Sequence, residues 1–139
     1  MGMYTELVMG VELINIPENV IKMLKKMTND KTMEKDEKIE IPDHKLFKSP
    51  RWEYMLYQGS YYFAGQPNSF LTEDNVSVEY GEPIYYFLTI RCNFKNYDNE
   101  LENFLDWIKP YCKKRTEHSK EFVGYYHYEE YEEPTLIYI

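Results

Sequence analysis

The chain has 139 residues, of which 24 are acidic and 16 basic, so its formal net charge is −8 at neutral pH. This length suits a single domain, and the acidic charge argues against direct nucleic-acid binding, which depends on lysine and arginine. The composition is unusual in its 15 tyrosines, a residue type enriched at protein interfaces. No apolar run reaches the roughly 20 residues of a membrane span. We therefore expect a cytoplasmic protein without a membrane partner.

A strand followed by a helix is predicted at the start of the chain. From Tyr4 to Ile14 apolar residues alternate with others, which is typical of a strand with one buried face. After Pro17 a helical stripe is formed by Val20, Ile21, Leu24 and Met27. Residues 29–45 carry dense mixed charge without an apolar period, which predicts a mobile charged loop.

The middle of the chain is expected to be irregular at first and then to form strands. Segment 41–53 contains several turn residues, and we predict that Phe47 and Trp52 pin it to the core. Strands are predicted after it at residues 54–64, 69–73 and 76–80. A hairpin should fall somewhere within 69–94, although the pattern does not settle its register.

The run from Ile84 to Phe94 is predicted to be the central strand of the sheet. Its even-numbered residues form the expected core face, and its odd-numbered residues form the other face. A helix should follow and end near Pro110, because proline disfavours helical geometry at the residue before it. Its expected buried stripe consists of Leu101, Phe104, Leu105 and Ile108.

The last part of the chain reads as a polar loop and two strands. Residues 113–120 form a basic loop, 121–130 a strand and 134–139 a final apolar strand. Residues 1–139 are thus predicted to form one α+β domain with a ferredoxin-like split βαβ plan. This plan has an antiparallel sheet, two helices on one face and an added hairpin. It hosts many functions and implies none by itself.

The residue pattern gives little support for catalysis, a metal or a cofactor. The three histidines lie far apart without metal-ligand spacing, and no phosphate-binding loop or nucleophile elbow is present. Cys92 and Cys112 are expected to be buried thiols. His127 shares a predicted strand face with Tyr125 and Glu129, which could in principle transfer protons. We expect no metal and no cofactor, and the pattern leans against an enzyme.

The candidate binding residues lie on the sheet face that the helices leave uncovered. On that face we expect Tyr85, Phe87, Arg91, Tyr125 and His127. A charged rim beside it would be formed by Glu129, Glu130, Glu132 and Glu133. Aromatic residues with an arginine on an open sheet also occur in RNA-recognition domains. Because the net charge is negative, a protein partner or a second copy of the chain explains these residues better.

Several segments resemble a group of small proteins encoded by bacteriophages. They are SYYF at 60–63, LTIRCNFKNYD at 88–98, FLDWIKP at 104–110, EFVGY at 121–125 and EPTLIY at 133–138. The resemblance covers most of the chain outside 29–45 and carries no catalytic motif. It implies a small accessory protein made inside an infected bacterium.

The leading hypothesis is a non-enzymatic phage accessory protein that binds and modulates or inhibits a host or defence protein with a basic surface. Two alternatives remain open. One is a protein that binds or hydrolyses a small, nucleotide-like ligand, with contacts from Arg91, Asn93 and His127. The other is a structural or virion-assembly protein.

Overall fold

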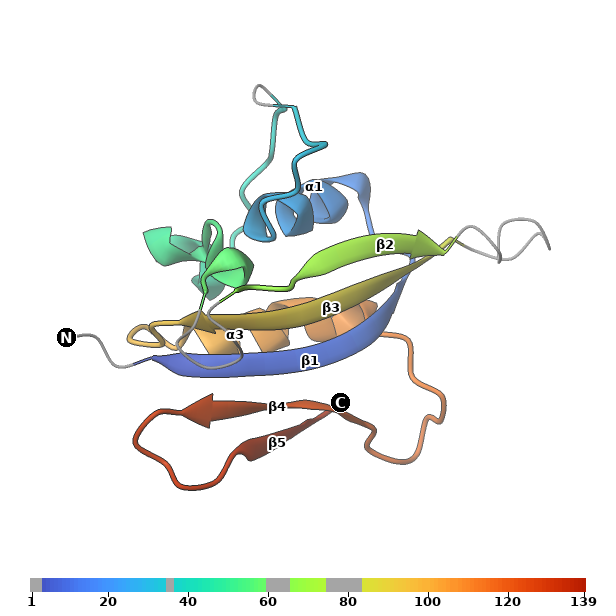
Figure 1. Ribbon diagram of the computed structural model, residues 1–139. Coiled ribbons are helices and arrows are strands. Elements are labelled where there is room, and N and C mark those ends of the chain that lie inside the picture. Colours follow the sequence, from blue (N-terminus) through green and yellow to red (C-terminus); the bar gives the residue numbers. More distant parts are fainter. Residues whose placement is uncertain (1–3, 35–36, 60–65, 75–83) are drawn as a thin grey trace.

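The computed structural model describes residues 4–34, 37–59, 66–74 and 84–139. These residues form an α+β fold with one sheet of five strands and two α-helices (Figure 1). The strands are β1 (Thr5–Ile14), β2 (Phe70–Asp74), β3 (Tyr85–Phe94), β4 (Phe122–Tyr128) and β5 (Thr135–Tyr138). The helices are α1 (Glu18–Met27) and α3 (Glu100–Ile108).

The sheet has the order β2-β3-β1-β4-β5, and every neighbouring pair is antiparallel. All ten residues of β1 pair with β3, from Thr5 opposite Phe94 to Ile14 opposite Tyr85. Strand β1 is therefore central, and the prediction that 84–94 is the central strand was wrong. Hydropathy shows which face of a strand is buried but not how many hydrogen-bonded neighbours it has, so the pattern could not distinguish the two positions.

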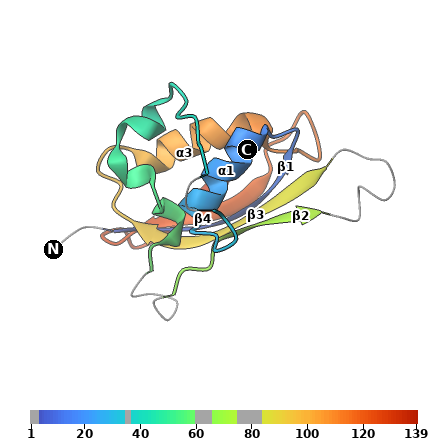
Figure 2. The same cartoon turned by 90° about the horizontal axis from the view of Figure 1, so that it is seen from above.

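The core lies between the sheet and the helices, which cover the same side of the sheet (Figure 2). The predicted core faces of both long strands are largely correct. Buried on them are Leu7, Met9, Val11, Leu13, Leu88, Ile90, Cys92 and Phe94. In α3 the residues Leu101, Phe104 and Ile108 are buried as expected, and Trp107 joins them. Leu105 is only partly buried at the margin of this core.

The segment from Lys45 to Tyr57 packs as three short 3-10 helices, at Lys45–Lys48, Pro50–Trp52 and Met55–Tyr57. Phe47 pins it as predicted, with its ring centroid 5.1 Å from that of Trp52 and 5.2 Å from that of Trp107. The predicted strand at 54–64 is wrong in its described part. Met55 and Leu56 are consecutive and both fully buried, whereas a strand would point them to opposite faces.

The sequence also predicts a loop at 29–45, a strand at 76–80 and a hairpin within 69–94. Residues 29–34 and 37–44 contain turns but neither helix nor strand, so a loop is correct there; its mobility stays a prediction. The predicted strand at 76–80 lies outside the described residues. Within 69–94 the strands β2 and β3 pair antiparallel, with Phe70 opposite Thr89 and Asp74 opposite Tyr85. The connection between these strands lies outside the described residues.

Leu101 and Leu105 of α3 differ in burial, so shortening each to alanine should lower the stability by different amounts. Leu101→Ala should lower the free energy of unfolding by roughly 2 to 5 kcal/mol, because it leaves a cavity in the closed core. Leu105→Ala should cost clearly less, because part of its side chain is already in water. Urea denaturation of both variants measures the difference. Equal losses would contradict this placement of α3.

Candidate functional site

The sheet face opposite the helices, called the open face below, carries the candidate site. The pairing registers define rows of neighbouring side chains across β3, β1 and β4. Glu6 lies between Asn93 and His127 in one row. Two residues further along β1, Val8 lies between Arg91 and Tyr125.

All five predicted open-face residues belong to this face, but they form two groups. Arg91, Tyr125 and His127 come together around β1, as the registers show. Phe87 and Tyr85 lie toward the other end of β3, opposite Glu12 and Ile14. Four residues of strand separate Phe87 from Arg91, which is about 13 Å. A single small ligand would therefore not contact both groups, whereas a protein surface could.

The ring of Tyr85 is less available for contact with a partner than the sequence suggests. This ring lies 4.3 Å from Nζ of Lys113, as a cation–π contact, and the residue is partly buried. Phe87 remains exposed on the same strand.

A polar cluster, formed by Glu6, Arg91, Asn93 and His127, occupies one end of the open face, with Arg91 and His127 partly buried. Glu6 and Asn93 are only 3% and 4% exposed, although both lie on the face expected to meet solvent. Burial raises the pKa of Glu6 to about 7, and the charges of Arg91 and His127 oppose that rise. A carboxyl group with such a pKa can exchange a proton near neutral pH. An ordinary strand glutamate gives no sequence signal for this, so sequence reasoning missed it.

Hydrogen bonds from two loops to the backbone of β3 hold this strand beside the polar cluster. The Asn93 amide donates to the carbonyl oxygen of Gln58 at 2.9 Å. The Arg91 amide donates to Oγ of Ser69 at 3.1 Å, and its carbonyl oxygen accepts from the Asn68 amide at 2.9 Å. Oδ1 of Asn93 is buried and has no hydrogen-bond partner within the described ranges. Because Asn93 is enclosed, it is a weaker candidate for ligand contact than the sequence suggested.

The predicted acidic rim forms the turn between β4 and β5, and all four of its glutamates are exposed. It begins immediately after the polar cluster, because His127 is two residues from Glu129. Nε2 of His127 lies 2.5 Å from the carbonyl oxygen of Tyr131, which closes the turn against the cluster. The rings of Tyr128 and Tyr131 pack edge to face at 5.2 Å. The rim is thus a defined turn with its carboxylates in water.

An exposed apolar patch accompanies these polar groups on the open face. We call it the aromatic patch; its members are Phe70, Phe87, Phe122, Leu136 and Tyr138. Phe122 and Tyr138 are 58% and 48% exposed, and their ring centroids lie 5.9 Å apart. Sequence analysis identified only Phe87 of this group. Phe70, Leu136 and Tyr138 come from the edge strands β2 and β5, and Phe122 begins β4. The pattern did not settle the register or the outward face of these strands.

The described residues offer little for metal or thiol chemistry. They contain no group of three histidine, cysteine or acidic residues placed to hold a metal ion. Burial raises the pKa of the Cys112 thiol to about 11 and raises that of Cys92 further. Thiols with such raised pKa values are poor nucleophiles.

Comparison with known proteins identifies no family for this chain. No family model, curated protein or solved structure matches the chain. Neither described helix is long and apolar enough to cross a membrane.

The raised pKa of Glu6 predicts an unusual pH dependence of stability. Between about pH 4.5 and 7 the native state holds this proton and the unfolded state does not, so the free energy of unfolding falls as pH rises. The contribution is up to roughly 3 kcal/mol. Glu6→Gln should remove this contribution. The free energy of unfolding should therefore fall less between pH 5 and pH 8 in the variant than in the wild type.

Urea denaturation at the two pH values tests this expectation. The exposed Glu130→Gln is the matched control, because it removes a carboxylate that water already solvates. The same pH dependence in the wild type and Glu6→Gln would show that Glu6 does not titrate near neutral pH.

Proposed function

We propose that this chain is a non-enzymatic protein that binds a partner protein through its open face. One observation carries the proposal: the helices cover one side of the sheet, and the other side presents the exposed aromatic patch, with the acidic rim at one end of that side. Exposed apolar clusters bordered by polar residues are typical of interaction surfaces. Exposed aromatic side chains supply contact area that a partner can remove from water.

The charge favours a partner with a basic surface. The chain carries a net charge of −8, and four exposed glutamates lie within the short turn between β4 and β5. Such a field accelerates the encounter with a positively charged protein and disfavours an acidic one. The same field disfavours nucleic acid as the direct partner.

We infer that the fold is of the ferredoxin-like split βαβ type with an added strand. The strand order β2-β3-β1-β4, with β5 next to β4, supports this interpretation. Folds of this type often leave one sheet face uncovered. The inference concerns architecture only, since such folds serve many functions.

The resemblance to bacteriophage accessory proteins suggests the cellular setting of the partner. We propose that it is a host or defence protein of the infected bacterium. An acidic surface that occupies a basic, nucleic-acid-binding site would inhibit that partner by competition. Inhibition in this form requires binding alone.

Reversing charge at the acidic rim should abolish partner capture. Glu130→Lys with Glu133→Lys raises the charge of the rim by four units, whereas Glu34→Lys with Glu40→Lys makes the same change at exposed positions outside it. We expect the wild type and the second variant to capture one stoichiometric protein from nuclease-treated bacterial lysate, and the rim variant to lose it. Mass spectrometry identifies the captured protein.

Two results would contradict this proposal. Equal capture by both charge variants would show that the acidic rim is not part of the interface. Absence of any captured protein, together with a dimer in sedimentation equilibrium that the rim variant disrupts, would make a second copy the partner instead.

A further inference from the structure

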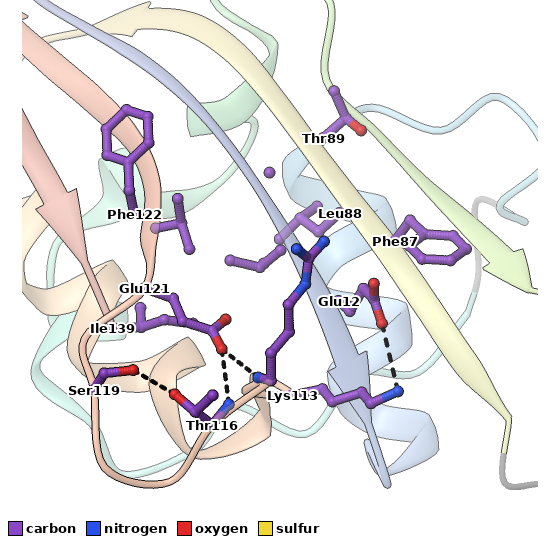
Figure 3. A pocket seen from close by; sticks show the side chains of 14 residues that line it. Glu12, Phe87, Leu88, Thr89, Lys113, Thr116, Ser119, Glu121, Phe122 and Ile139 are labelled. Carbon is purple, nitrogen blue, oxygen red and sulfur yellow. Dashed lines mark hydrogen bonds and ion pairs between the residues drawn. The ribbon is translucent and has the colours of Figure 1, made fainter.

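A groove of about 690 Å³ lies on the open face, and no residue of the polar cluster or the acidic rim lines it. Figure 3 shows the side chains that line it. Its floor includes Gly10 and Thr89, which face each other in the register of β1 and β3. Phe87 and Phe122 line it from the strands on either side of β1. The segment 113–121 closes the remaining side. This volume is within the range of sites that hold small organic ligands.

The segment 113–121 is held in place at both ends, so the groove is built before any ligand arrives. The Lys113 amide donates to the carbonyl oxygen of Glu12 at 2.8 Å. At the other end Glu121 and Ile139 exchange two backbone hydrogen bonds, of 2.9 and 3.0 Å. Oε1 of Glu121 also accepts from the amides of Arg115 and Thr116, which fixes the bend between these ends (Figure 3).

The charges at this segment favour an anion, in contrast to the rest of the molecule. Residues 113–120 contain four basic side chains and one acidic side chain, within a chain of net charge −8. The two carboxylates that line the groove are already engaged, Glu121 by backbone amides and Glu12 by Nζ of Lys113 at 3.8 Å. Arg115 is an exposed residue that lines the groove, and its side chain makes no ion pair with any described residue. An arginine in that state suits a carboxylate or phosphate.

The apolar walls favour a flat ring attached to that anionic group. Phe87 and Phe122 are 37% and 58% exposed, so both can offer ring surface to a ligand. Aromatic side chains stack on planar groups at little conformational cost. The hydroxyl groups of Thr116 and Ser119, which bond to each other, lie on the basic side of the groove.

Gly10 keeps the floor of the groove open. A β-carbon at this position would meet only the carbonyl oxygen of Leu88, at 3.9 Å, which is ordinary contact. The strand therefore tolerates a side chain here, and that side chain would project into the groove because Gly10 belongs to the open face. A substitution at Gly10 can fill the groove without straining the backbone.

We propose that this groove binds a small ligand made of a planar ring that carries a phosphate or a carboxylate. The ring lies against Phe87 and Phe122, and Arg115 pairs with the anionic group. This inference assigns a second kind of ligand to the open face. The groove shares Phe87 and Phe122 with the aromatic patch, whereas the acidic rim and the polar cluster contribute nothing to it.

Isothermal titration calorimetry with the full chain tests the proposal. Adenosine monophosphate probes the phosphate form of the ligand and 1-naphthoate the carboxylate form, while adenosine and inorganic phosphate each supply one half of the first probe. We expect at least one of the two planar anions to bind at millimolar concentration or below, and each half alone to bind at least about tenfold more weakly.

Three variants locate the binding. Arg115→Gln should weaken it about tenfold, and Gly10→Val should abolish it while the protein still unfolds cooperatively in urea. Lys38→Gln, an exposed position in another segment with the same change of charge, should bind as the wild type does. The proposal is overturned if neither planar anion binds, if inorganic phosphate binds as well as the nucleotide, or if Arg115→Gln and Gly10→Val leave binding unchanged.

Discussion

The pairing of β1 with two neighbours is the constraint on which the rest of the structure depends. Strand β1 pairs with β3 along its full ten residues and with β4 along five, so it joins the two halves of the sheet. The approach of β4 requires a glycine: a β-carbon at Gly124 would lie 2.1 Å from the carbonyl oxygen of Val8. Any larger residue there would push β4 and β5 away from β1. The core, the acidic rim and part of the aromatic patch would move with them.

The same register separates the core face of β1 from its open face. Because side chains alternate along β1, a shift by one residue would exchange its buried row for Glu6, Val8, Gly10 and Glu12. The packing of Leu7 to Leu13 against the helices therefore also fixes the open face. Glu6 is enclosed on that face, and its raised pKa shows that its charged form is destabilised there. The charges of Arg91 and His127 offset part of this destabilisation.

The two ends of the open face carry opposite charge. The acidic rim and the polar cluster lie where β4 ends, whereas the basic segment 113–121 borders the groove near the start of β4. We infer two binding events with opposite electrostatics, a basic protein at one end and a small anion at the other. Both sites lie on the same sheet face, so a ligand in the groove would lie close to the surface that the proposed partner contacts.

The sequence by itself determined the alternating faces of β1 and β3, the buried stripe of α3 and the outward placement of Phe87, Arg91 and His127, because hydrophobic periodicity records burial directly. Only the tertiary structure decided which strand is central, the burial of Glu6 and Asn93, and the 3-10 helix that replaces the strand expected at Met55 and Leu56. It also brought Gly10, Phe122 and Arg115 around one groove. These features depend on which segments distant in the chain become neighbours, and neither a residue's own type nor its local spacing carries that information.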